Sequence, residues 1–233
     1  MLIGILECGP APDALRPQYG DYPDFFERLL AGRGLTFRRY RVMEMQFPGD
    51  VHECDGWLLT GSKFGAYEDH PFIRPLEEFI RNAYRADVPV VGICFGHQIM
   101  AQAMGGKVEK YAGGWTAGPT DYDFEGERVT LNAWHQDQVT VKPEAAELAG
   151  TNATCPIAAL RYGDRMYSVQ AHPEFGQEFM DRLMEVRGKG VVPDALLERA
   201  RGRLGEHLDS ALIADRIAAF FHDHKQRAEP VGA

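Results

Sequence analysis

The chain has 233 residues, of which 45% are hydrophobic and 25% are charged, proportions typical of a soluble globular protein. A formal net charge of −9 argues against a surface that binds nucleic acid or an anionic membrane. No apolar run approaches the length that crosses a bilayer, and the first residues lack the basic and apolar segments of a secretion signal.

Cysteine usage indicates a reducing compartment. Cys8, Cys54, Cys94 and Cys155 lie far apart, with no C-x-x-C pair and no spacing typical of a metal site. Because no secretion signal precedes them, we expect reduced thiols in a cytoplasmic protein. We expect neither a metal ion nor an organic cofactor.

The first part of the chain alternates short apolar runs with amphipathic segments, which predicts a mostly parallel sheet flanked by helices. Strands are predicted at residues 2–7, 36–42, 56–60 and 88–93, and helices at residues 24–31, 72–86 and 95–104. The run 88–93 is apolar enough to be a central strand buried on both faces.

The pattern changes after Gly105 and Gly106. Shorter and more polar strands are predicted at residues 107–111, 120–124, 128–131, 138–141, 157–162 and 166–170, the last two joined by a turn at Gly163 and Asp164. They predict a small antiparallel extension of a three-layer α/β fold. The rest of the chain is predicted to be helical, and we expect a single domain over residues 1–233, with a core of about 2–185 and C-terminal helices at about 190–225.

Residues 90–98 have the form of a nucleophile elbow, the sharp strand-to-helix turn that exposes a reactive side chain above a sheet. Cys94 lies between Gly92 and Gly96, where a Cβ would crowd so tight a turn. The helix predicted from Phe95 directs N–H groups and its positive dipole end at the sulfur, which favours the thiolate. The alternative is a buried structural cysteine, but the two glycines and the polar Gly-His-Gln that follows favour a catalytic one.

A base for this cysteine is predicted just after the strand 166–170. His172 and Glu174 lie there two residues apart, and Pro173 stiffens the link between them. A histidine beside a glutamate is by itself a weak signal. If the strand runs parallel to the one before Cys94, or ends at the same sheet edge, the two loops meet and a nucleophile, a base and an orienting acid come together.

The turn Thr60-Gly61-Ser62 also follows a predicted strand. Taken alone it is an ordinary β-turn of small residues. It could also offer a backbone N–H to an oxyanion, with the second donor at Phe95, the residue after the nucleophile.

These motifs together resemble the class I (triad-type) glutamine amidotransferases. Gly-Ile-Cys-Phe-Gly-His-Gln, the downstream His-Pro-Glu and the upstream Thr-Gly-Ser occur in the order of that family, and the resemblance spans roughly residues 2–185. It implies the flavodoxin-like fold of these enzymes, and a thiolate that attacks the side-chain amide of glutamine to form a γ-glutamyl thioester.

Carried over to this chain, the resemblance assigns the catalytic triad to Cys94, His172 and Glu174. It assigns the oxyanion hole to Gly61 and Phe95. Two substrate contacts follow in the same way. Gln98, one turn into the elbow helix, would face the substrate pocket, and Trp115 falls where family members contact the glutamine backbone, although its surroundings depart from the family pattern.

A second histidine lies in a related pattern. Residues 134–139 are similar to the Ser-His-x-Asp-x-Val segment of the glutaminase half of GMP synthase, with Trp134 in place of Ser. We therefore expect a structural or substrate-loop role for His135 and Asp137, rather than a role in the triad.

Three functions remain open at this point. The chain shows no P-loop and no Ser-Gly-Gly-x-Asp pyrophosphatase loop, so we expect no second catalytic domain. It is expected to be a stand-alone hydrolase of glutamine or a related γ-glutamyl amide, similar to the glutaminase domain of GMP synthase. The alternatives are a peptidase acting on γ-glutamyl peptides or glutathione derivatives, and a glutaminase subunit that depends on a separate synthase. The expected partner is a small-molecule substrate, with no nucleic acid and no membrane.

Overall fold

The computed structural model describes residues 1–228. In the first part of the chain the elements are β1 (Leu2–Leu6), α1 (Arg16–Tyr19), α2 (Tyr22–Leu29), β2 (Thr36–Tyr40), the 3₁₀ turn η1 (Val42–Glu44), β3 (Gly56–Leu59), α3 (Ile73–Arg85), β4 (Val90–Ile93) and α4 (Phe95–Ala103). The strands and helices predicted for this part are confirmed, with ends that differ by a few residues. The exceptions are α1 and η1, single turns that were not among the predicted elements.

The second part begins with shorter strands. Its elements are β5 (Lys107–Lys110), β6 (Thr116–Phe124), β7 (Glu127–His135), β8 (Asp137–Val141), β9 (Glu147–Gly150), β10 (Ala159–Tyr162), β11 (Met166–Val169), α5 (Gln177–Leu183), the π-helical turn η2 (Met184–Gly188), α6 (Asp194–Gly202) and α7 (Ser210–Ala228). The prediction missed β9 and gave β6 and β7 too few residues, because polar positions of a two-stranded ribbon break the apolar alternation.

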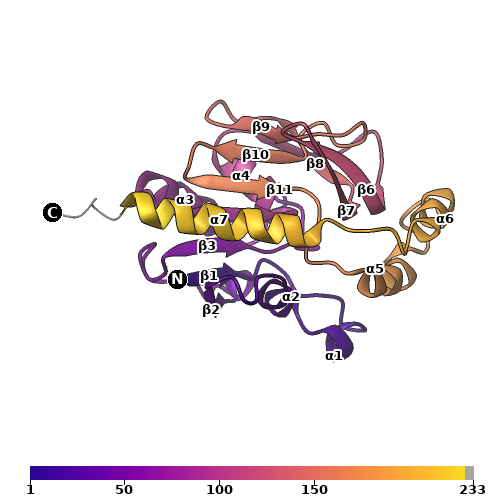
Figure 1. Ribbon diagram of the computed structural model, residues 1–233, viewed down its shortest axis with the longest axis horizontal. Coiled ribbons are helices and arrows are strands. Elements are labelled where there is room, and N and C mark those ends of the chain that lie inside the picture. The colour runs from indigo at the N-terminus through magenta and orange to yellow at the C-terminus, as the bar shows by residue number, and fades with distance from the viewer. Residues whose placement is uncertain (229–233) are drawn as a thin grey trace.

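A seven-stranded sheet in the order β2-β1-β3-β4-β11-β10-β9 forms the middle layer (Figure 1). Strands β2, β1, β3, β4 and β11 run parallel, whereas β10 and β9 pair antiparallel at one edge. The antiparallel extension consists of this edge and of two ribbons, β5–β8 and β6–β7. The expected three-layer, mostly parallel α/β fold is therefore confirmed.

Helices cover both faces of the sheet. Side chains of α3 and α4 form one hydrophobic cluster with Trp57 and Leu59 of β3. On the other face, α2 and the long α7 form a second cluster with Leu58 of the same strand. Successive β3 side chains thus enter opposite cores, as expected for a strand buried on both faces. Within the described part of the chain, no helix is long and apolar enough to span a membrane.

A third hydrophobic cluster lies at one end of the molecule. It joins Tyr22 and Phe25 at the start of the chain with Phe175, and with Leu183 and Met184 of α5 and η2. Figure 1 shows α5 and α6 at the same end as α1. Three neighbouring parallel strands, β3, β4 and β11, end on the edge of the sheet that carries the residues described next.

Candidate active site

Cys94 lies between β4 and α4 in a strained backbone conformation. Its φ is +54° and its ψ is −102°, values that a non-glycine residue rarely adopts. Hydrogen bonds fix this geometry, because Cys94 N donates to Val169 O at 2.8 Å and Cys94 O accepts from Gln98 N at 3.0 Å. The structure thus has the strand–turn–helix form of a nucleophile elbow.

The two glycines around Cys94 are required by close backbone contacts. A Cβ on Gly96 would lie 2.6 Å from the carbonyl oxygen of Leu59 in the neighbouring strand. A Cβ on Gly92 would lie 2.6 Å from the carbonyl oxygen of Gly96 and 2.4 Å from the sulfur of Met100. Neither position has room for a side chain, so α4 can start directly above the sheet.

His172 and Glu174 follow β11, which runs parallel to β4, so the condition set by the sequence is met. His172 Nδ1 and Glu174 Oε1 are 2.7 Å apart, and both side chains are buried. The ring of Phe175 stacks on the imidazole with a centroid distance of 4.0 Å and an interplanar angle of 3°. The carboxylate and the stacked ring together fix the orientation of the imidazole.

The charges around His172 favour its protonated form. Burial alone would lower the pKa of His172, but the nearby charges of Glu174 and Cys94 outweigh it and raise this pKa to about 10. The Cys94 sulfur therefore lies close to an imidazolium whose other nitrogen is held by a carboxylate. This is the arrangement that supports a thiolate nucleophile and a proton donor in one site.

Gly61 lies against both of these side chains. A Cβ built on Gly61 would be 3.1 Å from His172 Cε1 and 3.9 Å from Cys94 Cβ. Thr60 Oγ1 donates to Gly61 O, and Ser62 Oγ donates to the carbonyl of Cys8, so the turn is held rigidly. Among residues 1–228, neither Gly61 N–H nor Phe95 N–H donates a hydrogen bond. Both N–H groups are thus free of protein acceptors.

Two buried amides connect the elbow to the histidine strand. Gln98 Nε2 donates to Gln170 Oε1 at 3.1 Å and to the carbonyl of Asp137 at 2.9 Å. Gln170 Nε2 in turn donates to the Cys94 sulfur at 3.6 Å. Gln98 was predicted to face the substrate pocket, and it does line the cleft, but its amide nitrogen is already engaged by the protein.

The Cys94 side chain opens into a cleft of about 380 Å³. Trp115 lines this cleft, and its ring lies 5.5 Å from that of Trp134. His135 also lines the cleft. Burial and the charge of His172 lower the pKa of His135 to about 3, and neither of its ring nitrogens has a hydrogen-bonding partner among residues 1–228. His135 is therefore a neutral residue of the cleft wall, and no carboxylate among residues 1–228 forms a hydrogen bond or an ion pair with its ring.

Some residues of the cleft were not predicted from the sequence. Tyr67 and Arg187 line the cleft without belonging to any motif, and Gln170 was not singled out although it directly precedes the His-Pro-Glu segment. Tyr22, the first residue of α2, also lines the cleft. Within residues 1–228, no group of three or more His, Cys, Asp or Glu side chains is arranged to hold a metal ion.

Comparisons with known proteins agree with this geometry. The family model described as "Glutamine amidotransferase class-I" matches residues 25–185. Gamma-glutamyl peptidase 2 of Arabidopsis thaliana is 26% identical, over 84% of this chain and 86% of that protein. GMP synthase of Bordetella bronchiseptica is 35% identical over 88% of this chain, but the match covers only 48% of that enzyme.

A solved structure resembles the whole chain. A glutamine amido transferase from Methylobacillus flagellatus superimposes with a TM-score of 0.73, covering 100% of this chain and 96% of that one at 20% identity. At this identity the likeness supports the fold alone.

Proposed function

The chain belongs to the class-I glutamine amidotransferase family, and we propose that it hydrolyses a γ-glutamyl amide through a thioester on Cys94. One observation carries the proposal. Cys94 sits at a strained elbow, next to an imidazole that Glu174 holds at 2.7 Å. A buried cysteine with a purely structural role needs neither the strain nor the oriented base.

In the proposed first step, the Cys94 thiolate attacks the amide carbon of the substrate. The carbonyl oxygen becomes an oxyanion, which the N–H groups of Gly61 and Phe95 stabilise. The C–N bond then breaks as the His172 imidazolium gives its proton to the leaving nitrogen, which departs as ammonia or an amine. Glu174 keeps Nδ1 of the imidazole oriented, so that Nε2 is the atom that transfers the proton.

The second step returns the enzyme to its starting state. Water attacks the thioester carbon while the neutral His172 accepts a proton from it. The C–S bond breaks, glutamate leaves, and the thiolate–imidazolium pair is restored. The residues described supply a nucleophile, a base that becomes an acid, and oxyanion donors, so the chemistry proceeds without a further group.

The γ-glutamyl peptidase alternative has support of its own. Several relatives that match most of this chain are named gamma-glutamyl peptidases, at 26 to 29% identity. The cleft of about 380 Å³ lies within the range that holds ligands larger than one amino acid. A partner-dependent glutaminase subunit is the other alternative, because GMP synthases carry a matching segment within a chain about twice as long.

The test starts from purified protein incubated with glutamine, γ-glutamyl dipeptides and glutathione, with ammonia and free amines measured. We expect Cys94→Ser to lose at least a thousandfold of the activity and to resist covalent labelling by a glutamine-like diazoketone. Cys155→Ser is the matched control, since Cys155 is a buried cysteine outside the cleft. Turnover and labelling that both survive in Cys94→Ser would refute the proposal.

Each alternative has its own outcome. Cleavage of peptides without cleavage of glutamine supports the peptidase. A protein that is inactive alone and hydrolyses glutamine only with a co-purified partner supports the subunit.

A further inference from the structure

Three cationic side chains line the cleft that holds Cys94: Lys63, Lys110 and Arg187. Among residues 1–228, none of the three forms an ion pair. Unpaired cations in a cleft are suited to bind an anionic part of a substrate.

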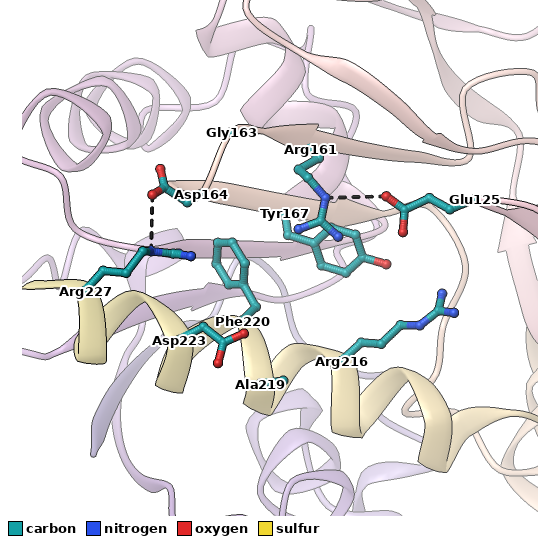
Figure 2. Close-up of a pocket in the computed structure, with 10 residues that line it drawn as sticks. All are labelled: Glu125, Arg161, Gly163, Asp164, Tyr167, Arg216, Ala219, Phe220, Asp223 and Arg227. Atoms are coloured by element: carbon teal, nitrogen blue, oxygen red, sulfur yellow. Dashed lines mark ion pairs between the residues drawn. The ribbon is translucent and has the colours of Figure 1, made fainter.

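A second cavity, of about 340 Å³ beside α7, shows the contrasting arrangement (Figure 2). Its arginines are neutralised by the protein, since Arg161 lies 3.5 Å from Glu125 and Arg227 lies 3.3 Å from Asp164. Within residues 1–228, each arginine that lines that cavity is paired with a carboxylate, so the cleft is the better candidate for binding an anion.

Arg187 is mounted on the histidine side of the cleft. It belongs to η2, a π-helical turn, and such turns occur often at functional sites. Leu183 and Met184, which precede it, pack in the cluster that contains Tyr22 and Phe175. Phe175 stacks on the imidazole of His172, so side chains of this cluster hold that ring in place.

The electrostatics around Tyr22 agree with this placement. Burial and the nearby charges of Cys94 and Glu174 raise the pKa of the Tyr22 hydroxyl, while the charge of Arg187 acts on it in the opposite direction. The Tyr22 hydroxyl is thus near enough to Cys94, Glu174 and Arg187 for their charges to affect its pKa. Tyr22 and Arg187 both line the cleft, and Tyr22 stacks on Phe175, the ring that in turn stacks on His172.

The other two cations of the cleft come from other segments of the chain. Burial raises the pKa of the Asp137 carboxyl, and the charge of Lys110 acts on this pKa in the opposite direction. The backbone carbonyl of Asp137 accepts a hydrogen bond from Gln98 of α4, so Lys110 lies on the side of the elbow helix. Lys63 follows the Gly61 turn, and its ammonium lies 5.3 Å from the ring of Phe64.

The proposed mechanism gives the position of Arg187 a chemical meaning. His172 must protonate the leaving nitrogen, so the leaving group has to lie on the imidazole side of the thioester. Ammonia as a leaving group is too small to contact side chains of η2, whereas an amino acid or a peptide would extend toward η2. Apolar side chains line the cleft near η2, because Val191 of the lining is 59% exposed and Trp134 of the lining lies beside Gly188.

We propose that Arg187 binds a carboxylate on the leaving amine, so that the preferred substrates are γ-glutamyl amino acids or peptides rather than glutamine. The inference rests on the hydrolysis proposed above. A guanidinium that meets a carboxylate forms strong, paired hydrogen bonds, which a neutral leaving group cannot replace.

Two substrates that differ only in that carboxylate provide the test: γ-glutamylglycine and γ-glutamylglycinamide. The measured quantity is the ratio of their kcat/KM values, with glutamine as a third substrate. We expect the wild-type ratio to favour the free carboxylate, and Arg187→Gln to lower the ratio by about ten- to a hundredfold. Arg187→Lys should restore part of it. Lys189→Gln, an exposed cation two residues away that does not line the cleft, should leave the ratio unchanged.

Three results would overturn the assignment to Arg187 while hydrolysis itself stands. The first is a ratio near one in the wild type, and the second is an unchanged ratio in Arg187→Gln. The third is a loss in Lys63→Gln or Lys110→Gln with none in Arg187→Gln. Failure of the wild type, both alone and with a co-purified partner, to cleave any of the three substrates would overturn the proposed function as well, and the inference with it.

Discussion

At the scale of single residues, the site depends on two groups that are costly to maintain. Cys94 holds a backbone conformation that costs about 1 to 3 kcal/mol. The Glu174 carboxylate is buried, and its Oε2 has no hydrogen-bonding partner among residues 1–228. Both costs make sense if the strain presents the sulfur and the carboxylate keeps His172 charged.

The raised pKa of His172 leads to a prediction about alkaline pH. Because this pKa is about 10, the imidazolium persists through neutral pH and is lost as the pH rises through 10. We expect kcat/KM for a γ-glutamyl amide to fall in that range, since the leaving nitrogen then has no proton donor. Alkylation of Cys94 by iodoacetamide should not fall with it, because a thiolate needs no acid.

Glu174→Gln separates this explanation from alkaline unfolding. The substitution removes the charge that raises the pKa of His172, so the alkaline fall should move at least one pH unit toward neutrality. Circular dichroism over the same range shows whether the fold persists. An alkaline fall that stays in place in the folded variant contradicts the role given to Glu174.

The residues of the site differ in how far the sequence could predict them. Cys94, His172 and Glu174 were predicted as a group, and the structure brings them together, because each follows a strand and neighbouring parallel strands end at one edge. No local sequence pattern around Arg187 indicates a place in the cleft, because its neighbours there come from segments that are distant in the chain. Gln98 was placed correctly near the pocket, but its bonds to Gln170 and Asp137 depend on packing that no local pattern encodes.

At the scale of elements, the elbow depends on how closely α4 approaches β3. Gly96→Ala would place a Cβ 2.6 Å from the carbonyl oxygen of Leu59, which belongs to the sheet and cannot rotate away. We expect the substitution to lower the free energy of unfolding by about 1 to 3 kcal/mol. It should also slow the alkylation of Cys94, because α4 has to move.

Gly202→Ala is the matched control for this prediction. A Cβ on Gly202, at the end of α6, would meet nothing within 4 Å. The control should leave alkylation unchanged and stability equal or slightly higher. Urea denaturation and alkylation kinetics measure both effects, and a Gly96→Ala protein that behaves like the control would show that the close contact is unimportant.

Elements were predictable where one side of the segment was consistently apolar. The parallel strands and α3 have such patterns, and their ends were placed within a few residues. β9 is a four-residue strand with two exposed positions, so its pairing with β10 determines its structure more than its own sequence does. The turn η2 continues the predicted helix, and its change of hydrogen-bond pattern has no residue signature.

At the scale of the whole molecule, the sequence predicted the layer order because both faces of the central strands are buried. The placement of α7 against α2 required the three-dimensional structure, since the two helices are far apart in the chain. That the chain forms a single domain stays a prediction.

Stability against acid is a property of the whole chain that two buried histidines should dominate. His97 is fully buried, its Nε2 lies 3.1 Å from the carbonyl of Ile157, and its Nδ1 accepts from the hydroxyl of Ser168 at 2.8 Å. Burial lowers the pKa of His97 to about 4, and that of His135 to about 3. The unfolded chain takes up these protons near pH 6.5. Their stabilisation is therefore complete above pH 6.5 and is lost as the pH falls toward 4.

Glu7 acts in the opposite direction over an overlapping range. Burial raises the pKa of Glu7 to about 7, so the folded chain holds this proton more tightly than the unfolded chain does. Its contribution favours folding at low pH and is lost as the pH rises from 4.5 through 7. Acidification therefore removes the histidine contributions while Glu7 offsets part of the loss.

Two substitutions resolve these opposing effects. In His97→Gln, the amide can donate to Ile157 and accept from Ser168 without titrating, so we expect the loss of stability between pH 6.5 and 4.5 to shrink by roughly 2 to 3 kcal/mol. In Glu7→Gln the offset disappears, so the same loss should become larger. Urea midpoints at the two pH values measure both changes. Two variants whose losses equal that of the wild type would mean that neither buried group governs the response to acid.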